Sequence, residues 1–372
     1  MMVCFRVDSS AIIGTGHVTR CLTLAEQFRN NGDIVTFICR ELPGNVIELI
    51  SATGFEVKKL PRADYGNLNQ DELGRHKNWL AVDWETDYRQ TKEIIESLSY
   101  PVDLLVADHY ALEENWEEKM ASHCGSIMMI DDLADRRHHC NLLLDQNYYK
   151  NLERRYDKLV PTSCHKMLGP SYALLRPEFY KTRQNMKRRN GKIEQVMVFF
   201  GGSDSSNQTG KVLKAISTNK FDAINFDIVI GSTNPYRSEI ETICASINNF
   251  TLHCQIDYMA DLMAQSDLSI GGGGTTTWER CCLGLPSITI ALAENQKIVA
   301  ELSHEIGFAI YLGYHTDIFP NQIAETLLNI IEQPDKLIKM SRRGQEFVDG
   351  MGASRVIENI LKFIGFKSNI KI

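Results

Sequence analysis

A histidine near the amino terminus has a sequence setting that suits acid–base chemistry. His17 follows residues 8–16, a loop that carries Gly14 and Gly16 and comes directly after a predicted strand. The two glycines allow a tight turn and a close approach of the backbone to a ligand, and the amides of the following helix point toward the same space. Because the positive end of a helix dipole disfavours imidazolium, we expect a neutral His17 that accepts a proton from water.

His17 has a second interpretation, as a surface residue that caps a helix. That interpretation is the better one for an isolated histidine, but a post-strand loop with two glycines favours a functional role. The Gly-x-Gly pair predicts little by itself. It lacks the third glycine of a dinucleotide-binding fingerprint, since Thr19 occupies that place.

A second polar cluster, Asp108-His109-Tyr110, directly follows a short apolar segment. The aspartate could cap the next helix and the tyrosine could simply pack, so structure and function start about even. Ligands of parallel α/β sheets gather at the carboxyl ends of the strands. This position therefore favours a role in lining a ligand site.

Two other clusters look at first like metal ligands. Asp131 and Asp132 are adjacent on an extended segment, where successive side chains point to opposite faces, so they are not expected to share one ion. His138-His139-Cys140 has the same geometry, and solvation at the surface explains it better than zinc does. We expect no metal site.

The strongest cluster is a run of four glycines, residues 271–274, between a predicted strand and a predicted helix. Their amides, followed by the hydroxyls of Thr275 and Thr276, suit a pyrophosphate. No Gly-Lys-Ser/Thr follows, so this is not a Walker loop. Glu279, one turn into the helix, either accepts hydrogen bonds from a ribose diol or merely complements the helix dipole.

Asn295 and Gln296 follow a later predicted strand and offer side-chain amides near the same site. Helix capping is the alternative role, and it explains one of these residues better than it explains both.

The elements that position these residues alternate between strands and helices. Continuous apolar strands of this kind predict parallel sheets covered on both faces. We expect strands at residues 2–7, 34–39, 102–107, 126–130, 141–144, 195–200, 226–230, 250–254, 268–270, 287–292 and 309–312. Residues 41–100 show a weaker pattern, and residues 353–364 predict an amphipathic helix.

The alternation starts afresh after residues 187–192, a charged segment without apolar residues that we interpret as a solvated connection. The sequence therefore predicts an α/β chain of two doubly wound, Rossmann-like domains that face each other across a cleft. We expect a domain with the catalytic base at 1–180, a second domain at 193–350 and a terminal helix at 351–372.

Composition excludes several classes of protein. The chain has 372 residues, 43% of them hydrophobic, which suits two packed domains. Its 40 Lys and Arg against 47 Asp and Glu argue against a nucleic-acid-binding protein. No apolar stretch reaches the ~20 residues of a membrane span, and the amino terminus lacks a secretory pattern. With ten cysteines mostly inside apolar runs, we expect a cytoplasmic protein without disulfides. No particular oligomeric state is favoured.

Taken together, the motifs resemble the family of UDP-2,4-diacetamido-2,4,6-trideoxy-β-L-altropyranose hydrolases of pseudaminic acid biosynthesis. The resemblance spans nearly the whole chain and is carried by residues 6–10, 13–22, 108–110, 130–136, 144–147, 169–176, 200–202, 271–280 and 295–296. It implies a GT-B fold similar to that of MurG-type N-acetylglucosaminyltransferases, with UDP held mainly by the C-terminal domain. It also implies metal-independent hydrolysis of the anomeric C–O bond, with inversion and without a cofactor.

The resemblance also implies roles for individual residues. The catalytic histidine of the family falls on His17 and its active-site tyrosine on Tyr110, which would orient the water or the imidazole together with Asp8. Contacts to the UDP-sugar would fall on Arg6, Gly14, Thr15, Gly16, Arg20, Asp108, Gly202, Gly272, Gly273, Gly274, Thr275, Thr276, Glu279, Asn295 and Gln296.

Three alternatives remain open on the sequence. An inverting glycosyltransferase of the same fold would use His17 on an acceptor hydroxyl, and it would need an acceptor surface. A nucleotide-sugar binding protein would bind UDP without turnover. A metal-dependent enzyme would lose activity in a chelator.

Overall fold

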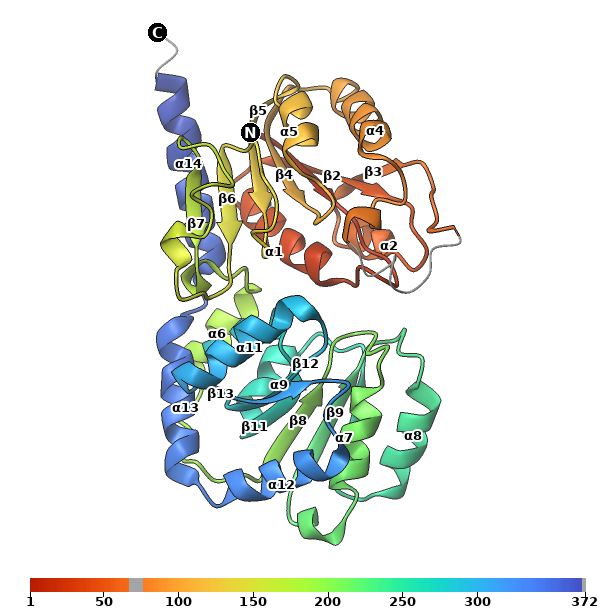
Figure 1. Cartoon of the computed structure of the whole chain (residues 1–372), viewed down its shortest axis with the longest axis vertical. Coiled ribbons are helices and arrows are strands. Elements are labelled where there is room, and N and C mark those ends of the chain that lie inside the picture. Colours follow the sequence, from red (N-terminus) through yellow and green to blue (C-terminus); the bar gives the residue numbers. More distant parts are fainter. Residues whose placement is uncertain (67–75, 370–372) are drawn as a thin grey trace. The chain divides into compact units, whose positions relative to one another are not determined.

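The chain folds into two compact units, which the computed structural model describes over residues 1–66 and 76–369 (Figure 1). The first unit comprises Met1–Leu174 and Gly352–Ile372, and the second comprises Leu175–Met351. Helix α14 (Gly352–Asn369) is the helix expected at the carboxyl terminus, and it is part of the first unit. Residues 370–372 of that expected segment lie outside the described residues.

The first unit is built on a sheet of seven described strands in the order β3-β2-β1-β4-β5-β6-β7, with every pair parallel. The strands are β1 (Met2–Val7), β2 (Ile34–Arg40), β3 (Glu56–Leu60), β4 (Val102–Asp108), β5 (Cys124–Ile130), β6 (Leu142–Asp145) and β7 (His165–Leu168). The described helices of this unit besides α14 are α1 (Gly16–Asn30), α2 (Ile47–Ala52), α4 (Trp84–Glu96) and α5 (Glu114–Met120).

Both faces of this sheet are covered, as the continuous apolar strands predict. Alternate residues of β1 belong to two different cores, with Phe5 on one face and Cys4 on the other. The face of Phe5 packs against α1, α2 and α14, and the face of Cys4 packs against α4 and α5. Burial on two sides explains why β1 is apolar at nearly every position.

Two strands of the first unit escape the sequence analysis. Strand β3 has the sequence EVKKL at the edge of the sheet, where only Leu60 is buried. Strand β7, HKML, lies at the opposite edge and buries only Met167. Edge strands with polar, half-exposed residues give neither the apolar run nor the clean alternation that identifies a strand.

The second unit has a sheet of six described strands in the order β10-β9-β8-β11-β12-β13, again all parallel. They are β8 (Gln195–Phe199), β9 (Asn225–Ile230), β10 (Phe250–Cys254), β11 (Leu268–Gly272), β12 (Ser287–Ala291) and β13 (Ala309–Tyr314), and each lies where the sequence predicts a strand. The helices are α6 (Pro177–Asn185), α7 (Gln208–Ile216), α8 (Arg237–Ser246), α9 (Met259–Gln265), α10 (Thr276–Cys282), α11 (Glu294–Ile306), α12 (Pro320–Ile331) and α13 (Pro334–Phe347).

The charged segment 187–192 is not wholly solvated, which corrects one expectation. Arg189 extends its guanidinium to the carbonyl oxygens of Met263 and Gly284, each 2.9 Å away, and also reaches the carbonyl of Ser266. These carbonyls lie at the carboxyl ends of α9 and α10, where cations are favourable. Arg189 therefore attaches the segment 187–192 to two helices of the second unit.

The described residues include no helix long and apolar enough to cross a membrane.

Candidate active site

Strand pairing brings the first two polar clusters together. Strands β1 and β4 are neighbours, and Val7 pairs with Asp108 in the register. The loop that follows β1 therefore begins beside the carboxyl end of β4. At this edge His17 lies in the first turn of α1, with only 8% of its surface exposed, and its Nδ1 atom is 2.6 Å from Asp108 Oδ1.

The charge on Asp108 fixes the tautomer of His17. Burial would raise the pKa of Asp108, but the Arg20 guanidinium and the His17 ring outweigh it, and the pKa lies well below its usual value. Because the carboxylate is ionised, it can only accept a hydrogen bond from the imidazole, so His17 Nδ1 carries the hydrogen. The lone pair of a neutral ring is then on Nε2. A histidine held in this way by a buried carboxylate has the geometry of a general base.

Arg20 ties this pair to Tyr110. Its guanidinium donates to both oxygens of Asp108, at 2.6 and 2.7 Å, and to Asp132 Oδ2 at 2.5 Å. The Tyr110 hydroxyl donates to the same Asp132 oxygen at 2.6 Å. The Tyr110 ring meets the His17 ring edge to face, with centroids 4.6 Å apart. His17 is therefore held by hydrogen bonding from Asp108 and by packing from Tyr110.

Asp8 is part of a different buried cluster. Its two oxygens receive hydrogen bonds from Arg6 at 2.6 and 2.8 Å, and Oδ1 also accepts from the backbone N–H of Arg40 at 2.7 Å. Arg6 in turn donates to Asp87. Both Asp8 and Arg6 are at most 1% exposed. The residue that contacts His17 Nδ1 is Asp108.

Three residues that the resemblance assigns to substrate contacts are buried. Arg6, Arg20 and Asp108 are 0%, 4% and 1% exposed, and their charged groups are engaged with one another or with buried carboxylates. In this structure these three residues hold one another and neighbouring carboxylates, whereas Thr15 and Gly16 at the start of α1 are exposed.

Two aromatic residues next to His17 were missed by the sequence analysis. His76, in the short 3-10 helix His76–Asn78, lies 5.0 Å from Tyr110 between ring centroids, and Trp79 stacks on Tyr110 at 5.4 Å. Trp79 also approaches His17, at 6.0 Å. Burial lowers the pKa of His76 below its usual value. Both residues fall in residues 41–100, where the periodicity is weak and no strand end marks them.

The glycine run in the second unit lies at the carboxyl end of β11, and its first two glycines are the last two residues of that strand. A Cβ on Gly271 would lie 2.3 Å from the carbonyl oxygen of Phe199, so only glycine fits there. Gly274 has more room, because its nearest neighbour would be Gln296 Nε2 at 3.6 Å. At Gly273 the Cβ of Gln296 would be 3.5 Å away. The glycine run therefore lies against the amino terminus of α11, the helix that contains Gln296.

The start of α11 offers unsatisfied donors. No side chain caps its first turn, at Ala293. Gln296 Oε1 accepts from the backbone N–H of Leu292 at 3.0 Å, which directs its other amide atom toward Gly274. Asn295 lies beside it in the same turn, half-buried. Capping thus accounts for Gln296 Oε1 but leaves an amide donor next to the glycine run.

A buried cation lies under the glycine run. Arg280 is 2% exposed and donates to the carbonyl oxygen of Gly272 at 2.7 Å. Within residues 1–66 and 76–369, no carboxylate lies at salt-bridge distance from its guanidinium. Burial lowers the pKa of Arg280 to about 10, so at neutral pH it keeps its charge. A buried positive charge without a carboxylate at salt-bridge distance favours an anion in the glycine run.

Glu279 lies one turn into α10 and is mostly buried. Burial raises the pKa of its carboxyl, opposed by Arg176, whose guanidinium is 3.9 Å away.

Gly202, after β8, accepts through its carbonyl from the backbone N–H of Gly231 at 3.1 Å. This bond joins the loops that follow β8 and β9. The structure thus groups the second-unit residues around the ends of adjacent strands.

The histidine pair that looked solvated is partly buried, which corrects the interpretation of residues 138–140. His138 is 1% exposed, and its Nδ1 is 2.6 Å from Glu117. Burial would lower the pKa of His138, but Asp131 and Glu117 outweigh it and hold that pKa at about 9. In the part of the chain that the structure describes, no group of three His, Cys, Asp or Glu could hold a metal ion.

Two units of this kind, each a doubly wound parallel sheet, define the GT-B fold of glycosyltransferases. The match to solved GT-B structures extends over nearly the whole chain. MurG of Acinetobacter baumannii is 12% identical, with a TM-score of 0.63, over 97% of this chain and 99% of that one. A UDP-glucosyltransferase of Polygonum tinctorium is 13% identical, with a TM-score of 0.69, over 98% of both chains. The fold predicted from the sequence is therefore confirmed.

More specific similarity is found in the sequence. Residues 196–353 match the family model of the glycosyltransferase family 28 C-terminal domain. The chain is 27% identical to UDP-2,4-diacetamido-2,4,6-trideoxy-β-L-altropyranose hydrolase of Campylobacter jejuni, over 84% of this chain and 100% of that protein. It is 26% identical to the spore coat polysaccharide biosynthesis protein SpsG of Bacillus subtilis, over 78% of this chain and 86% of that protein. These similarities confirm the resemblance inferred from the motifs.

Proposed function

We propose that this protein hydrolyses UDP-2,4-diacetamido-2,4,6-trideoxy-β-L-altropyranose, or a close UDP-diacetamido sugar, to UDP and the free sugar. The observation that carries the proposal is the pairing of His17 with buried Asp108 at 2.6 Å, in a chain similar to a hydrolase of that substrate over that protein's whole length. The pairing supports the presence of a general base, and the similarity supports UDP as the leaving group and the diacetamido sugar as the group that is released.

Water is the nucleophile in this reaction. Its oxygen attacks the anomeric carbon while the C–O bond to UDP breaks, and the bonding electrons leave with the diphosphate oxygen. His17 Nε2 takes the proton from the attacking water, and Asp108 stabilises the imidazolium that forms. A single displacement inverts the anomeric configuration. Tyr110 positions the ring by packing against it.

UDP leaves readily if its charge is stabilised, and the second unit carries the groups for this. Amides of residues 272–274, the first turn of α11 and the Gln296 side-chain amide would donate to the diphosphate. Arg280 would supply the opposite charge from beneath. Glu279 would accept from the ribose hydroxyls, and the Thr275 and Thr276 hydroxyls and Asn295 would complete the contacts.

A glycosyltransferase is the second candidate, favoured by the family 28 domain at residues 196–353. The same base would then deprotonate an acceptor hydroxyl instead of water. A protein that only binds the nucleotide sugar, and an enzyme that needs a metal, make further distinct predictions. The first would release no product, and the second would stop in a chelator.

One experiment separates these candidates. The purified protein is incubated with a panel of UDP-diacetamido sugars, and free sugar is followed by NMR with and without candidate acceptors and with EDTA. We expect release of free sugar without any acceptor and unchanged in EDTA. Release that requires an acceptor would establish the transferase instead.

A further inference from the structure

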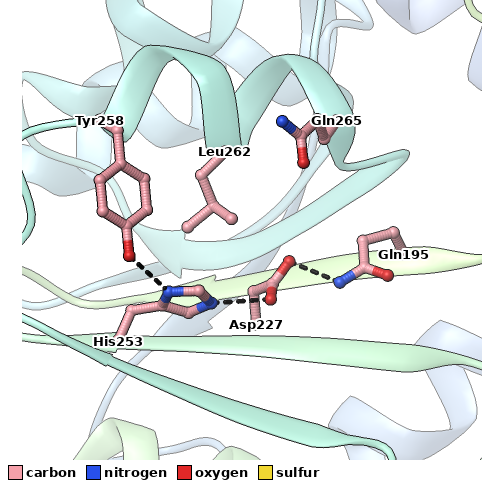
Figure 2. A pocket seen from close by; sticks show the side chains of 6 residues that line it. All are labelled: Gln195, Asp227, His253, Tyr258, Leu262 and Gln265. Atoms are coloured by element: carbon pink, nitrogen blue, oxygen red, sulfur yellow. Dashed lines mark hydrogen bonds and ion pairs between the residues drawn. The ribbon is translucent and has the colours of Figure 1, made fainter.

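A cavity in the second unit contains a histidine, an aspartate and a tyrosine that the proposed reaction does not use. The cavity measures about 450 Å³ and lies between α9 and the face of strands β8, β9 and β10. Figure 2 shows three side chains of the helix segment 258–265 above three side chains of the sheet. The lining residues are Gln195, Asp227, His253, Tyr258, Leu262 and Gln265.

The polar side chains of the sheet are joined by hydrogen bonds (Figure 2). Asp227 Oδ1 is 2.8 Å from His253 Nε2, and Gln195 donates its amide to the other oxygen of Asp227. His253 Nδ1 is 3.0 Å from the Tyr258 hydroxyl. Because a carboxylate only accepts, His253 Nε2 carries hydrogen and Nδ1 of a neutral ring accepts from Tyr258.

This arrangement leaves hydrogen-bond acceptors facing the cavity. The Gln195 amide donates one of its two hydrogens to Asp227, and its carbonyl oxygen remains an acceptor. The Tyr258 hydroxyl donates its hydrogen to His253, and its oxygen keeps lone pairs that can accept. Asp227 keeps further lone pairs and a negative charge, and it is 6% exposed. The six lining residues include one carboxylate and no lysine or arginine. The ligand that complements these groups is a cation with several N–H donors.

The helix side of the cavity adds an apolar wall. The Tyr258 residue is 45% exposed, so one face of its ring is accessible to a cation, and Leu262 lies one turn further along α9. Cations bind favourably over an accessible aromatic face, and an alkyl chain packs on leucine. We propose that this cavity binds a primary alkylammonium, with the ammonium at Asp227 and the chain along Tyr258 and Leu262.

This site is separate from the proposed nucleotide site. None of its six lining residues belongs to the glycine run or to α11, and Gln195 and Asp227 lie on strands β8 and β9 rather than in the loops that follow them. Occupation of the cavity therefore does not depend on the hydrolase proposal.

The test is titration of the full-length protein with n-butylammonium, followed by NMR of the His253 and Tyr258 ring signals. The neutral isostere 1-butanol and the anion butyrate are the matched ligands. We expect saturable shifts with n-butylammonium at a Kd of about 0.1–10 mM, as suits five heavy atoms, and at least about tenfold weaker binding of 1-butanol.

Variants locate the binding energy. Asp227→Asn removes the charge and should weaken n-butylammonium binding at least about tenfold. Tyr258→Ala, at an exposed position that does not threaten folding, should weaken it about two- to fivefold. Asp257→Asn, next to Tyr258 but outside the cavity, should leave the Kd within about twofold. Binding of 1-butanol as tight as that of n-butylammonium, an unchanged Kd in Asp227→Asn, or no saturable shift up to about 100 mM would each overturn the proposal.

Discussion

At the scale of single residues, the site depends on a buried carboxylate that sets the protonation of a histidine. His17 and Asp108 are 91 positions apart in the chain and 2.6 Å apart in space. The proposed base therefore depends on the pairing of β1 with β4 as much as on its own loop. Substitution of His17 tests the role of the base, and substitution of Asp108 tests the control of its tautomer.

Removal of the base should slow turnover without affecting nucleotide binding. A positioned general base contributes about 10²–10⁴-fold, so His17→Ala and His17→Asn should lower kcat by about that factor. UDP affinity, measured by calorimetry, should stay within about twofold because the proposed UDP contacts lie in the other unit. His139→Asn, at a side chain that is 48% exposed, is the control. Undiminished kcat in both His17 variants would contradict the role of His17.

Replacement of the carboxylate should impair the base by changing its tautomer. In Asp108→Asn, the amide N–H facing His17 Nδ1 would leave the ring hydrogen on Nε2, where it cannot accept a proton. We expect kcat to fall by about 10²–10⁴-fold. A ¹⁵N NMR spectrum of the imidazole should show the change of tautomer, which a purely structural effect would not produce. An active variant with the hydrogen on Nε2 would refute the mechanism.

The sequence predicted part of this site because of its residue types. His17, Asp108 and Tyr110 stand at strand ends or in glycine-bearing loops, and such places can be recognised without coordinates. The sequence favoured Asp8 for the orienting role, because Asp8 and Asp108 both stand at strand ends and no pattern shows which of them lies 2.6 Å from the imidazole. His76 and Trp79 carry no such mark.

At the scale of elements, the glycine run owes its conformation to contacts that differ between neighbouring positions. A side chain at Gly271 would clash with the backbone of β8, whereas one at Gly274 would make only an ordinary contact with Gln296. The same substitution should therefore have opposite consequences at the two positions.

Gly271→Ala should destabilise the second unit, and Gly274→Ala should not. The new methyl at residue 271 would meet the Phe199 carbonyl oxygen at 2.3 Å, and overpacking of this kind costs about 1–3 kcal/mol. At residue 274 the contact is an ordinary 3.6 Å, but the methyl would crowd the proposed diphosphate position and weaken UDP binding. Chemical denaturation and UDP titration of both variants check this. Equal stability of the two would contradict the packing argument.

Prediction of elements worked where both faces of a strand are buried. β1, β4 and β12 are rich in apolar residues and buried at nearly every position, because helices cover the sheet on two sides. The edge strands β3 and β7 could not be found in this way, because their exposed positions accept polar residues. His138 is the opposite case, because its polar segment suggests exposure but its side chain is buried. It is paired with Glu117, and no pattern in the sequence shows that these two residues lie close together.

At the scale of the whole molecule, buried carboxylates make stability depend on pH. Burial would raise the pKa of each of three carboxylates, but neighbouring cationic groups outweigh this effect. The groups are Arg6 and His109 at Asp8, and Arg20 and His17 at Asp108. At Asp131 they are His138 and Arg136. Each pKa therefore lies below its ordinary value. These groups stabilise the fold fully above about pH 4, where the unfolded chain is also ionised.

Below about pH 4 the unfolded chain binds protons that the folded first unit does not. The free energy of unfolding should then fall by about 1.4 kcal/mol per pH unit for each such carboxylate. Calorimetry between about pH 6 and about pH 2.5 should show the unfolding transition of the first unit moving steeply to lower temperature. A transition that stays constant across this range would contradict the depressed pKa values.

The central claim is that water attacks the anomeric carbon and UDP leaves with its oxygen. The most direct measurement is the reaction of the UDP-diacetamido sugar in H₂¹⁸O, with NMR of the first-formed anomer and mass spectrometry of both products. The account predicts ¹⁸O in the free sugar, unlabelled UDP and an inverted anomeric configuration, all lost together in His17→Asn. Label in the UDP, or retention of configuration, would contradict it.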